Sequence, residues 1–330
     1  MPSHLAKFAA ALLLFAAATP ATQAQDLPKQ DLPNKPIHIV IAFPPGGPTD
    51  FVGRLVADKV KDILKQTILI ENKPGANGAI GADYVAKAEP DGTTLFLTTL
   101  GAVGVTPHMR SDVRYDTLKD FAPVIPIGIQ PVVLIVAPSK GFKTVADLVA
   151  AAKANPGAMN FASAGIGSTS HMGAERFRHA AGFQAQHIPF RGPAEAFAEV
   201  MSGRIDFYFL PLAPALALVK QGKVIALAVG AEQRSPDLPD VPTMAEAGLP
   251  DASYHFWGGI FAPAKTPREI IRRLHDETAK ALEVPEVRER LAKTATGPMP
   301  MSTEQFTRYF QDDVASTVKL AKDVGIQPPN

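Results

Sequence analysis

Cysteine is absent from this sequence of 330 residues, and tryptophan occurs only once. Without thiols the chain forms no disulfide, no thiolate metal site and no cysteine nucleophile. A chain of this length can bury a core large enough to fold without disulfides. The length also predicts two lobes or domains. The motifs H-E-x-x-H and G-K-[ST] are also missing, and the eight histidines show no metal-ligand spacing. We therefore expect no metal and no cofactor.

The sequence also has no large excess of charge of either sign and no long apolar run. The formal net charge is only +1, and the segment 1–24 contributes a single charge, Lys7. The rest of the chain is therefore balanced and has no overall field that would recruit nucleic acid or an anionic membrane. The apolar run AAALLLFAAA has about ten residues, whereas a membrane span needs roughly 20.

That apolar run has the features of an export signal. The weakly positive start MPSHLAKF precedes it, and the small residues of TPATQAQ follow it. This order predicts a signal peptide over residues 1–24 that is cleaved near Ala24. We expect the mature chain to be soluble and to lie in the periplasm.

From Lys35 onward, β-branched runs alternate with amphipathic stretches. The pattern predicts strands at 37–43, 67–72 and 94–99, with helices at 49–64 and 78–88 between them. This βαβαβ order predicts a parallel sheet with right-handed crossovers. The next apolar run, 122–140, is interrupted by Pro126, Gly128 and Pro131, and we interpret it as a strand that leaves one lobe and enters another.

A second series of strands and helices follows. We expect strands at 159–163, 186–190, 205–210 and 224–230 and helices at 144–154, 168–181, 193–202 and 213–221. The run 252–264 is the expected return crossing, and the helices 267–282, 284–294 and 303–324 then pack back on the first lobe. The prediction is an α/β protein of two lobes, each a mainly parallel sheet flanked by helices, with two crossover strands at the hinge. The first lobe comprises 35–128 plus 256–330, and the second comprises 129–255.

Three corners between a strand and a predicted helix share one chemical style. They read FPPGGPTD (43–50), TTLGAVGVTP (98–107) and ASAGIGSTSH (162–171). The start of a helix exposes unpaired amides and the positive end of the helix dipole, so it can hold an anion. Each corner alone could merely end a strand and cap a helix. Three of them, at the carboxyl ends of strands in two lobes, favour a small anionic or polar ligand.

Catalytic motifs are weak by comparison. Ser163 lies in FASAG, where Phe161 replaces the first glycine of the G-x-S-x-G elbow. Ser168, His171 and Glu175 could share one face of a helix, but we interpret them as a cap, a polar group of the pocket and a surface charge. We therefore expect that this protein is not an enzyme.

Four further side chains have either a role at the site or a structural one. Arg54 and Arg191 could each form a forked pair of hydrogen bonds with a carboxylate, although a solvated or structural role is the alternative for both. For Trp257 and Phe256, in the return crossing, we expect hinge or core packing.

The sequence resembles a known family in the runs KPIHIVIAFPPGGPTDFVGRLVADKV, ILIENKPGANGAIGADYVAKAEPDGTTL and FASAGIGSTSHMGAERF. It continues through IPFRGPAEAFAEVMSGRIDFYF, VPTMAEAGLP and FWGGIFAPAKTPREIIRRL. These motifs, in order over 35–326, are similar to the periplasmic substrate-binding proteins of tripartite tricarboxylate transporters, the Bug family. The resemblance implies a periplasmic binding protein of type II that closes around a small carboxylate and delivers it to permease subunits in the membrane.

The resemblance also implies where the ligand binds. In the first lobe the matching positions are Phe43, Gly46, Gly47, Pro48, Thr49, Asp50, Thr99, Leu100 and Gly101. In the second lobe they are Ser163, Ala164, Gly165, Gly167, Ser168 and His171, to which Arg191 and Gly192 add. The chain departs from the family at Pro193, where a serine is frequent, at Glu199, where an aspartate is common, and in a second corner without asparagine.

Several alternatives stay open at this point. Because of these departures the identity of the ligand stays open among citrate-like acids, dicarboxylic acids of four to six carbons and aromatic carboxylates. A binding protein that reports its ligand to a sensor kinase would have the same site, and a periplasmic hydrolase is the alternative from another class. We expect a monomer that binds no nucleic acid.

Overall fold

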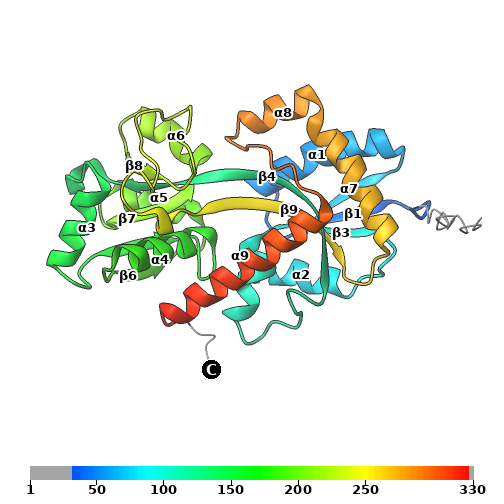
Figure 1. The fold of residues 1–330 in the computed structure, drawn as a ribbon, viewed down its shortest axis with the longest axis horizontal. Helices are drawn as coiled ribbons and strands as arrows, with labels where there is room; N and C mark the ends of the chain where they lie inside the picture. The colour runs from blue at the N-terminus through cyan, green and yellow to red at the C-terminus, as the bar shows by residue number, and fades with distance from the viewer. Residues whose placement is uncertain (1–31, 327–330) are drawn as a thin grey trace, which may run out of the picture. The chain divides into compact units, whose positions relative to one another are not determined.

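The structure, a computed structural model, describes residues 32–326 (Figure 1). The first series of elements is β1 (Ile37–Ile41), α1 (Pro48–Leu64), β2 (Ile68–Asn72), α2 (Ala79–Ala86) and β3 (Thr94–Thr99). Strand β1 pairs in parallel with both β2 and β3, which confirms the parallel sheet expected from the βαβαβ order. The predicted signal peptide, 1–24, lies outside the described residues.

The second series begins at α3 (Val145–Ala154), which a capping box of Thr144 and Asp147 starts. It continues with β5 (Asn160–Ser163), α4 (Thr169–Ala181), β6 (Gln186–Pro189), α5 (Pro193–Met201), β7 (Phe207–Pro211), α6 (Leu212–Lys220) and β8 (Ile225–Val229). Strand β5 pairs in parallel with β6 and β7. Strand β8 is antiparallel to its partner β4, so this sheet is mixed.

Two long strands connect the two series. Strand β4 (Phe121–Val136) runs antiparallel to β9 (His255–Pro263) from the pair Phe121–Pro263 to the pair Pro131–His255 (Figure 1). From Val132 onward β4 pairs with β7 instead. The chain therefore has a two-lobed α/β fold with two crossing strands. The residue boundaries predicted for the lobes stay a prediction. The change of partner of β4 at Val132 lies close to the predicted boundary at 128/129.

Pro123, Pro126 and Gly128 of β4 lie at irregular points of its ladder. The register shifts between Pro123 and Ile125 and again between Pro126 and Gly128. Proline is tolerated at such bulges because no ladder hydrogen bond is needed there. Gly128 has a φ of +156°, and a methyl group on it would lie 2.4 Å from Thr296 Cγ2. Only glycine allows the segment around Thr296 to approach the crossing strand so closely.

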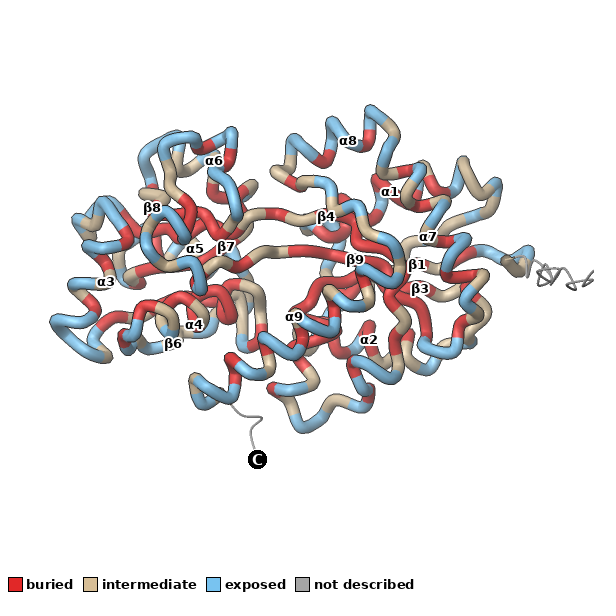
Figure 2. The backbone as a smooth tube through the Cα atoms, viewed as in Figure 1, coloured by how far each residue is buried: buried red, intermediate tan, exposed pale blue. Residues whose placement is uncertain are grey.

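The C-terminal helices are α7 (Arg268–Glu283), α8 (Pro285–Ala292) and α9 (Thr303–Asp323). Strands β1 and β3 bury both faces, as the red tube shows in Figure 2, whereas the edge strand β2 is only partly buried. Val40 and Phe96 pack in the cluster that includes α9, whereas Ile39 and Ile41 pack in the cluster that includes α1 and α7. This alternation follows from the period of two along a strand.

Trp257 packs in the core of the crossing region, as expected. It is 1% exposed, and its Nε1–H donates to Asp313 Oδ2 of α9 over 2.7 Å. Three aromatic rings of α9, those of Phe306, Tyr309 and Phe310, pack against it with centroids 5.5–6.2 Å away. Among residues 32–326 no helix is both long enough and apolar enough to cross a bilayer.

Candidate functional site

The first corner follows β1 and starts α1. Gly47 is the N-cap residue and Pro48 the first helical residue, where a missing N–H costs nothing. Gly46 is exposed and has a φ of +81°, a conformation that favours glycine. Phe43 is half-buried, and its carbonyl accepts a hydrogen bond from Asn72 Nδ2 over 3.0 Å. The end of β2 therefore holds this corner in place.

Asp50 turns its carboxylate back into the corner. It accepts hydrogen bonds from Gly46 N–H at 2.9 Å, from Arg54 Nε at 3.0 and 3.1 Å, and from Asn72 Nδ2 at 2.8 Å. Burial by itself would raise its pKa, but these hydrogen bonds and the charge of Arg54 outweigh it and lower the pKa to about 2. Arg54 thus has the structural role that was the alternative to ligand binding.

The second corner differs from the expectation. Thr99 and Leu100 are buried, but no α-helix follows them. A π-helical turn, η2 (Gly101–Val105), and a 3-10 turn, η3 (Thr106–His108), replace it, so the expected helix start is wrong here. Side-chain hydroxyls satisfy carbonyls of this irregular segment, since Thr106 Oγ1 donates to Gly101 O over 2.8 Å and Thr117 Oγ1 to Val103 O over 2.9 Å.

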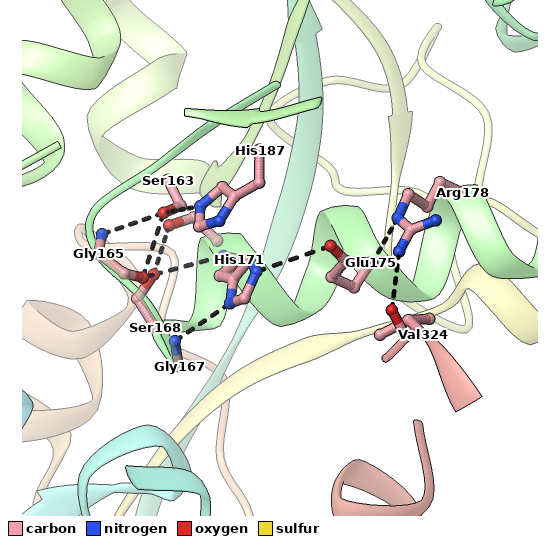
Figure 3. Close-up of polar contacts among 10 residues, drawn as sticks. Ser163, Gly165, Gly167, Ser168, His171, Glu175, Arg178, His187 and Val324 are labelled. Carbon is pink, nitrogen blue, oxygen red and sulfur yellow. Dashed lines mark hydrogen bonds and ion pairs between the residues drawn. The ribbon is translucent and has the colours of Figure 1, made fainter. Parts of the chain in front are cut away.

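The third corner joins β5 to α4 and is bonded within itself (Figure 3). Ser168 is the N-cap of α4, since its Oγ accepts from His171 N–H at 3.3 Å, and it donates to Gly165 O over 2.7 Å. Ser163 Oγ accepts from Gly165 N–H at 3.1 Å, and Ser170 Oγ accepts from Ala164 N–H at 2.9 Å. The interpretation of Ser168 as a helix cap is confirmed, and the loop is held by hydrogen bonds of its own.

His171 extends this network along α4. Gly167 N–H donates to His171 Nδ1 over 3.1 Å, so the ring proton lies on Nε2, which is 3.6 Å from Glu175 Oε1. Glu175 also pairs with Arg178, whose Nη2 donates to Val324 O over 3.5 Å, just after α9 (Figure 3). Glu175 is 4% exposed, so its expected role as a surface charge is wrong. Its charge is compensated by the ion pair with Arg178, and the Nε2–H of His171 faces it from the other side.

His187, which the sequence did not single out, completes this cluster. Its ring stacks on that of His171 with centroids 3.9 Å apart, and its Nε2 is 2.6 Å from Ser163 Oγ. Burial above all, with the charge of Arg178 beside it, lowers the pKa of His187 from 6.5 to about 3. The distance suits a nucleophile and its base, but so low a pKa makes His187 a poor base at neutral pH. Ser163 is also fully buried, so the pair stabilises the loop.

The second and third corners meet. A methyl group in place of a hydrogen on Gly101 would lie 3.2 Å from Gly167 O. One on Gly167 would lie 3.2 Å from Met109 Sδ and 3.5 Å from Asn77 Nδ2. The structure therefore brings the ends of β3 and β5 into backbone contact across the lobes. The first corner lies beside the second, because β1 and β3 are neighbouring parallel strands.

Arg191 and Gly192 lie at the end of β6. Arg191 is exposed, and its N–H donates to Glu195 Oε2 over 3.2 Å. Gly192 is the N-cap of α5, with an extended φ of −178°. Their contacts in the structure are thus with their own lobe.

A cavity of about 910 Å³ lies elsewhere, between β4, α7, α8, the loop 233–237 and the segment 295–302. None of the predicted ligand-binding residues lines it. Its walls are mostly apolar, and its arginines are paired, Arg234 with Glu246 and Arg288 with Glu283. It offers no unpaired cation to a carboxylate, so the corners remain the better candidate site. No cluster of three or more histidine and acidic side chains that could hold a metal ion occurs within 32–326.

Comparison with known proteins shows the family of this chain. Residues 52–326 match the family described as the tripartite tricarboxylate transporter family receptor. The chain belongs to this receptor family. This receptor is 36% identical to a UPF0065 protein of a Pseudomonas species, over 93% of this chain and 91% of the relative. It is 31% identical to BugT of Bordetella pertussis, over 89% and 90%, and the resemblance to the Bug family is thereby confirmed.

Solved structures resemble this receptor over nearly its whole length. A Rhodopseudomonas palustris protein with adipate has a TM-score of 0.80 at 31% identity, and covers 91% of this chain and 100% of its own. MatC from the same organism, with bound malate, has a TM-score of 0.76 at 31% identity, over 87% and 99%. The periplasmic binding protein BugD has a TM-score of 0.75 at 29% identity, over 90% of this chain and 100% of its own, and the predicted fold class is confirmed.

Proposed function

We propose that this receptor captures a small organic carboxylate between its lobes in the periplasm and delivers it to permease subunits in the membrane. The observation that carries the proposal is the meeting of the corners at Gly101 and Gly167, which brings the carboxyl ends of strands of both lobes together. Ligands of open α/β sheets bind at such strand ends. The malate and adipate of the two structural neighbours are both dicarboxylates.

The first corner supplies the features that a carboxylate needs. Helix α1 has 17 residues, and its start points unpaired amides and the positive dipole end toward the corner. Asp50 and Arg54 neutralise each other, so the corner presents fixed dipoles instead of a mobile charge. We place one carboxylate of the ligand here, at Gly47, Thr49 and Thr99, and the other predicted residues of the first lobe around it.

The second lobe reads the rest of the ligand. Because the loop at Gly165 and Ser168 is already bonded within itself, it can act as a rigid wall with little ordering cost on binding. Ligand contacts to this lobe exist only when the lobes are closed, so the ligand favours closure by the free energy of these contacts. A closed complex is then the form that we expect the permease to recognise.

A thermal-shift screen tests the proposal. Malate, adipate, citrate and benzoate are each added to the purified mature chain, and at least one should raise its melting temperature. Ligand at 100 times its dissociation constant adds about 2.7 kcal/mol to stability. Gly47→Val and Ser168→Val should abolish that shift. Thr144→Val, which removes the corresponding hydroxyl cap from α3, should keep it. A shift that survives in both site variants would refute the proposed site.

A further inference from the structure

The segment between β2 and α2 has an unusual backbone. Gly75, Ala76, Asn77 and Gly78 all have positive φ, at 124°, 49°, 50° and 91°. Glycine adopts this region at little cost, but a residue with a Cβ pays roughly 1–2 kcal/mol. Ala76 and Asn77 are two of the four non-glycine residues with positive φ within 32–326. Strain of this kind persists where the surrounding structure requires a particular geometry.

The strained turn directs the Asn77 side chain to the second corner. Asn77 Nδ2 donates to Thr106 Oγ1 over 2.9 Å, and Thr106 Oγ1 donates in turn to Gly101 O over 2.8 Å. Thr106 is buried, so this bond is shielded from water. The turn after β2 is thereby tied to the irregular segment after β3.

The same amide faces the other lobe. A methyl group on Gly167 would lie 3.5 Å from Asn77 Nδ2, and one on Gly101 would lie 4.0 Å from it. Two glycines thus leave the space that the carboxamide occupies where the lobes meet. A carboxamide has two N–H donors and one acceptor oxygen, and the bond to Thr106 uses only one of the donors.

We propose that Asn77 determines how readily the two lobes close, by packing its carboxamide between the corner at Gly101 and the corner at Gly167. The inference rests on the proposed capture of a ligand between the lobes. It adds a residue that acts on the equilibrium between the open and closed forms and that neither the helix starts nor the glycine motifs indicate. The strained turn is the cost of placing this side chain at the contact.

The test measures closure without any ligand. The chain contains no cysteine, so Asp62→Cys in α1 and Lys153→Cys in α3 give two unique, exposed labelling sites on different lobes. Nitroxide labels on both report the distribution of distances between the lobes by pulsed electron paramagnetic resonance. In this background Asn77→Gly removes the side chain and keeps a backbone for which a φ of 50° is permitted.

We expect Asn77→Gly to lower the ratio of closed to open molecules about threefold, because the van der Waals contacts between its carboxamide and the corner at Gly167 exist only in the closed form. Its melting temperature should stay the same or rise, because glycine relieves the strained conformation. Gly101→Ala, which puts a methyl group 3.2 Å from Gly167 O, should shift the distances in the same direction. Asn155→Gly, at the exposed end of α3, should shift nothing.

An unchanged distance distribution in Asn77→Gly would overturn the inference. So would a fall in melting temperature with unchanged distances, because Asn77 would then stabilise only its own lobe. Because no ligand is present, the outcome is independent of the screen described above. A receptor that binds no carboxylate would refute the proposed function and leave the role of Asn77 in closure standing.

Discussion

Asp50 lies in the first turn of α1, where an anion would otherwise meet the helix dipole. Its carboxylate bonds to Gly46 N–H, Arg54 and Asn72, so it holds the corner in shape and neutralises the nearest arginine. The Gly46 amide is thereby occupied by Asp50. Polar residues at this corner therefore divide into those that build the loop and those that face the ligand.

The first prediction concerns Asp50→Asn. The pKa of Asp50 is lowered from 3.8 to about 2, so its contribution to stability is present above about pH 4 and is lost as the pH falls toward 2. We expect the variant to lose about 2 kcal/mol of unfolding free energy at pH 7, measured by urea denaturation. The gap should narrow by pH 3. Asp58→Asn, an exposed acid of the same helix, should show neither effect; equal losses in both variants would contradict this account.

The second prediction concerns His187→Gln. The folded state keeps His187 neutral, whereas the unfolded state protonates it below about pH 6.5, so stability is lost as the pH falls from 6.5 toward 3. Between pH 7.5 and pH 5 this loss should amount to about 1–2 kcal/mol, discounted for partial exposure. The variant should show a shallower dependence of melting temperature on pH. His179→Gln, on the exposed side of α4, is the control, and equal slopes in all three proteins would argue against His187.

At the scale of the elements, the spacing of apolar residues and the positions of glycine and proline predicted most of the fold. Strand β3 has the expected bounds, and α9 ends one residue early. The second corner was missed because TTLGAVGVTP has the glycines and hydroxyls of a helix start. Gly104 instead lets α9 approach, since a methyl group on it would lie 2.8 Å from Val314 Cγ2. A contact with a helix 200 residues away leaves no local signal.

The cluster at the third corner shows the same limit. Ser168 as a cap follows from the sequence, because a serine precedes an apolar pattern. The stack of His171 on His187 depends on the parallel pairing of β5 with β6, which places His187 beside Phe161. Asn77 could have been suspected, since the dipeptide Asn-Gly is typical of turns with left-handed residues. Its position opposite Gly167 depends on the arrangement of two lobes.

The third prediction concerns the packing of α1, which presents the first corner. A methyl group on Gly53 would lie 2.4 Å from Leu97 Cδ2 and 2.8 Å from Ile41 Cδ1. In an open helix Gly→Ala stabilises by up to about 1 kcal/mol, but here overpacking should reverse the sign and cost about 1–3 kcal/mol. Gly173→Ala in α4, with its nearest atoms at 3.3 Å, should cost less in the same urea titration. A stabilised Gly53→Ala protein would show that α1 is not so closely packed.

At the scale of the whole molecule, β4 and β9 connect two lobes, and the corners at the strand ends of both lobes form the proposed carboxylate site. This site needs both lobes: the first supplies the start of α1, the second a loop bonded within itself, and Asn77 lies between the second and third corners. The apolar cavity beside β4 belongs to neither part of this arrangement. We therefore expect the corners alone to determine the size and charge of the ligand that binds.

The most direct test is isothermal titration calorimetry of the mature chain with malate, adipate, citrate and benzoate, each compared with its uncharged amide. The account predicts that at least one acid binds with a dissociation constant of about 1 μM or tighter, equivalent to roughly −8 kcal/mol. Its amide should bind at least about 100-fold more weakly, since charge-assisted hydrogen bonds to the carboxylate are lost. Equal binding of acid and amide, or no heat from any acid of the panel, would contradict carboxylate capture by these corners.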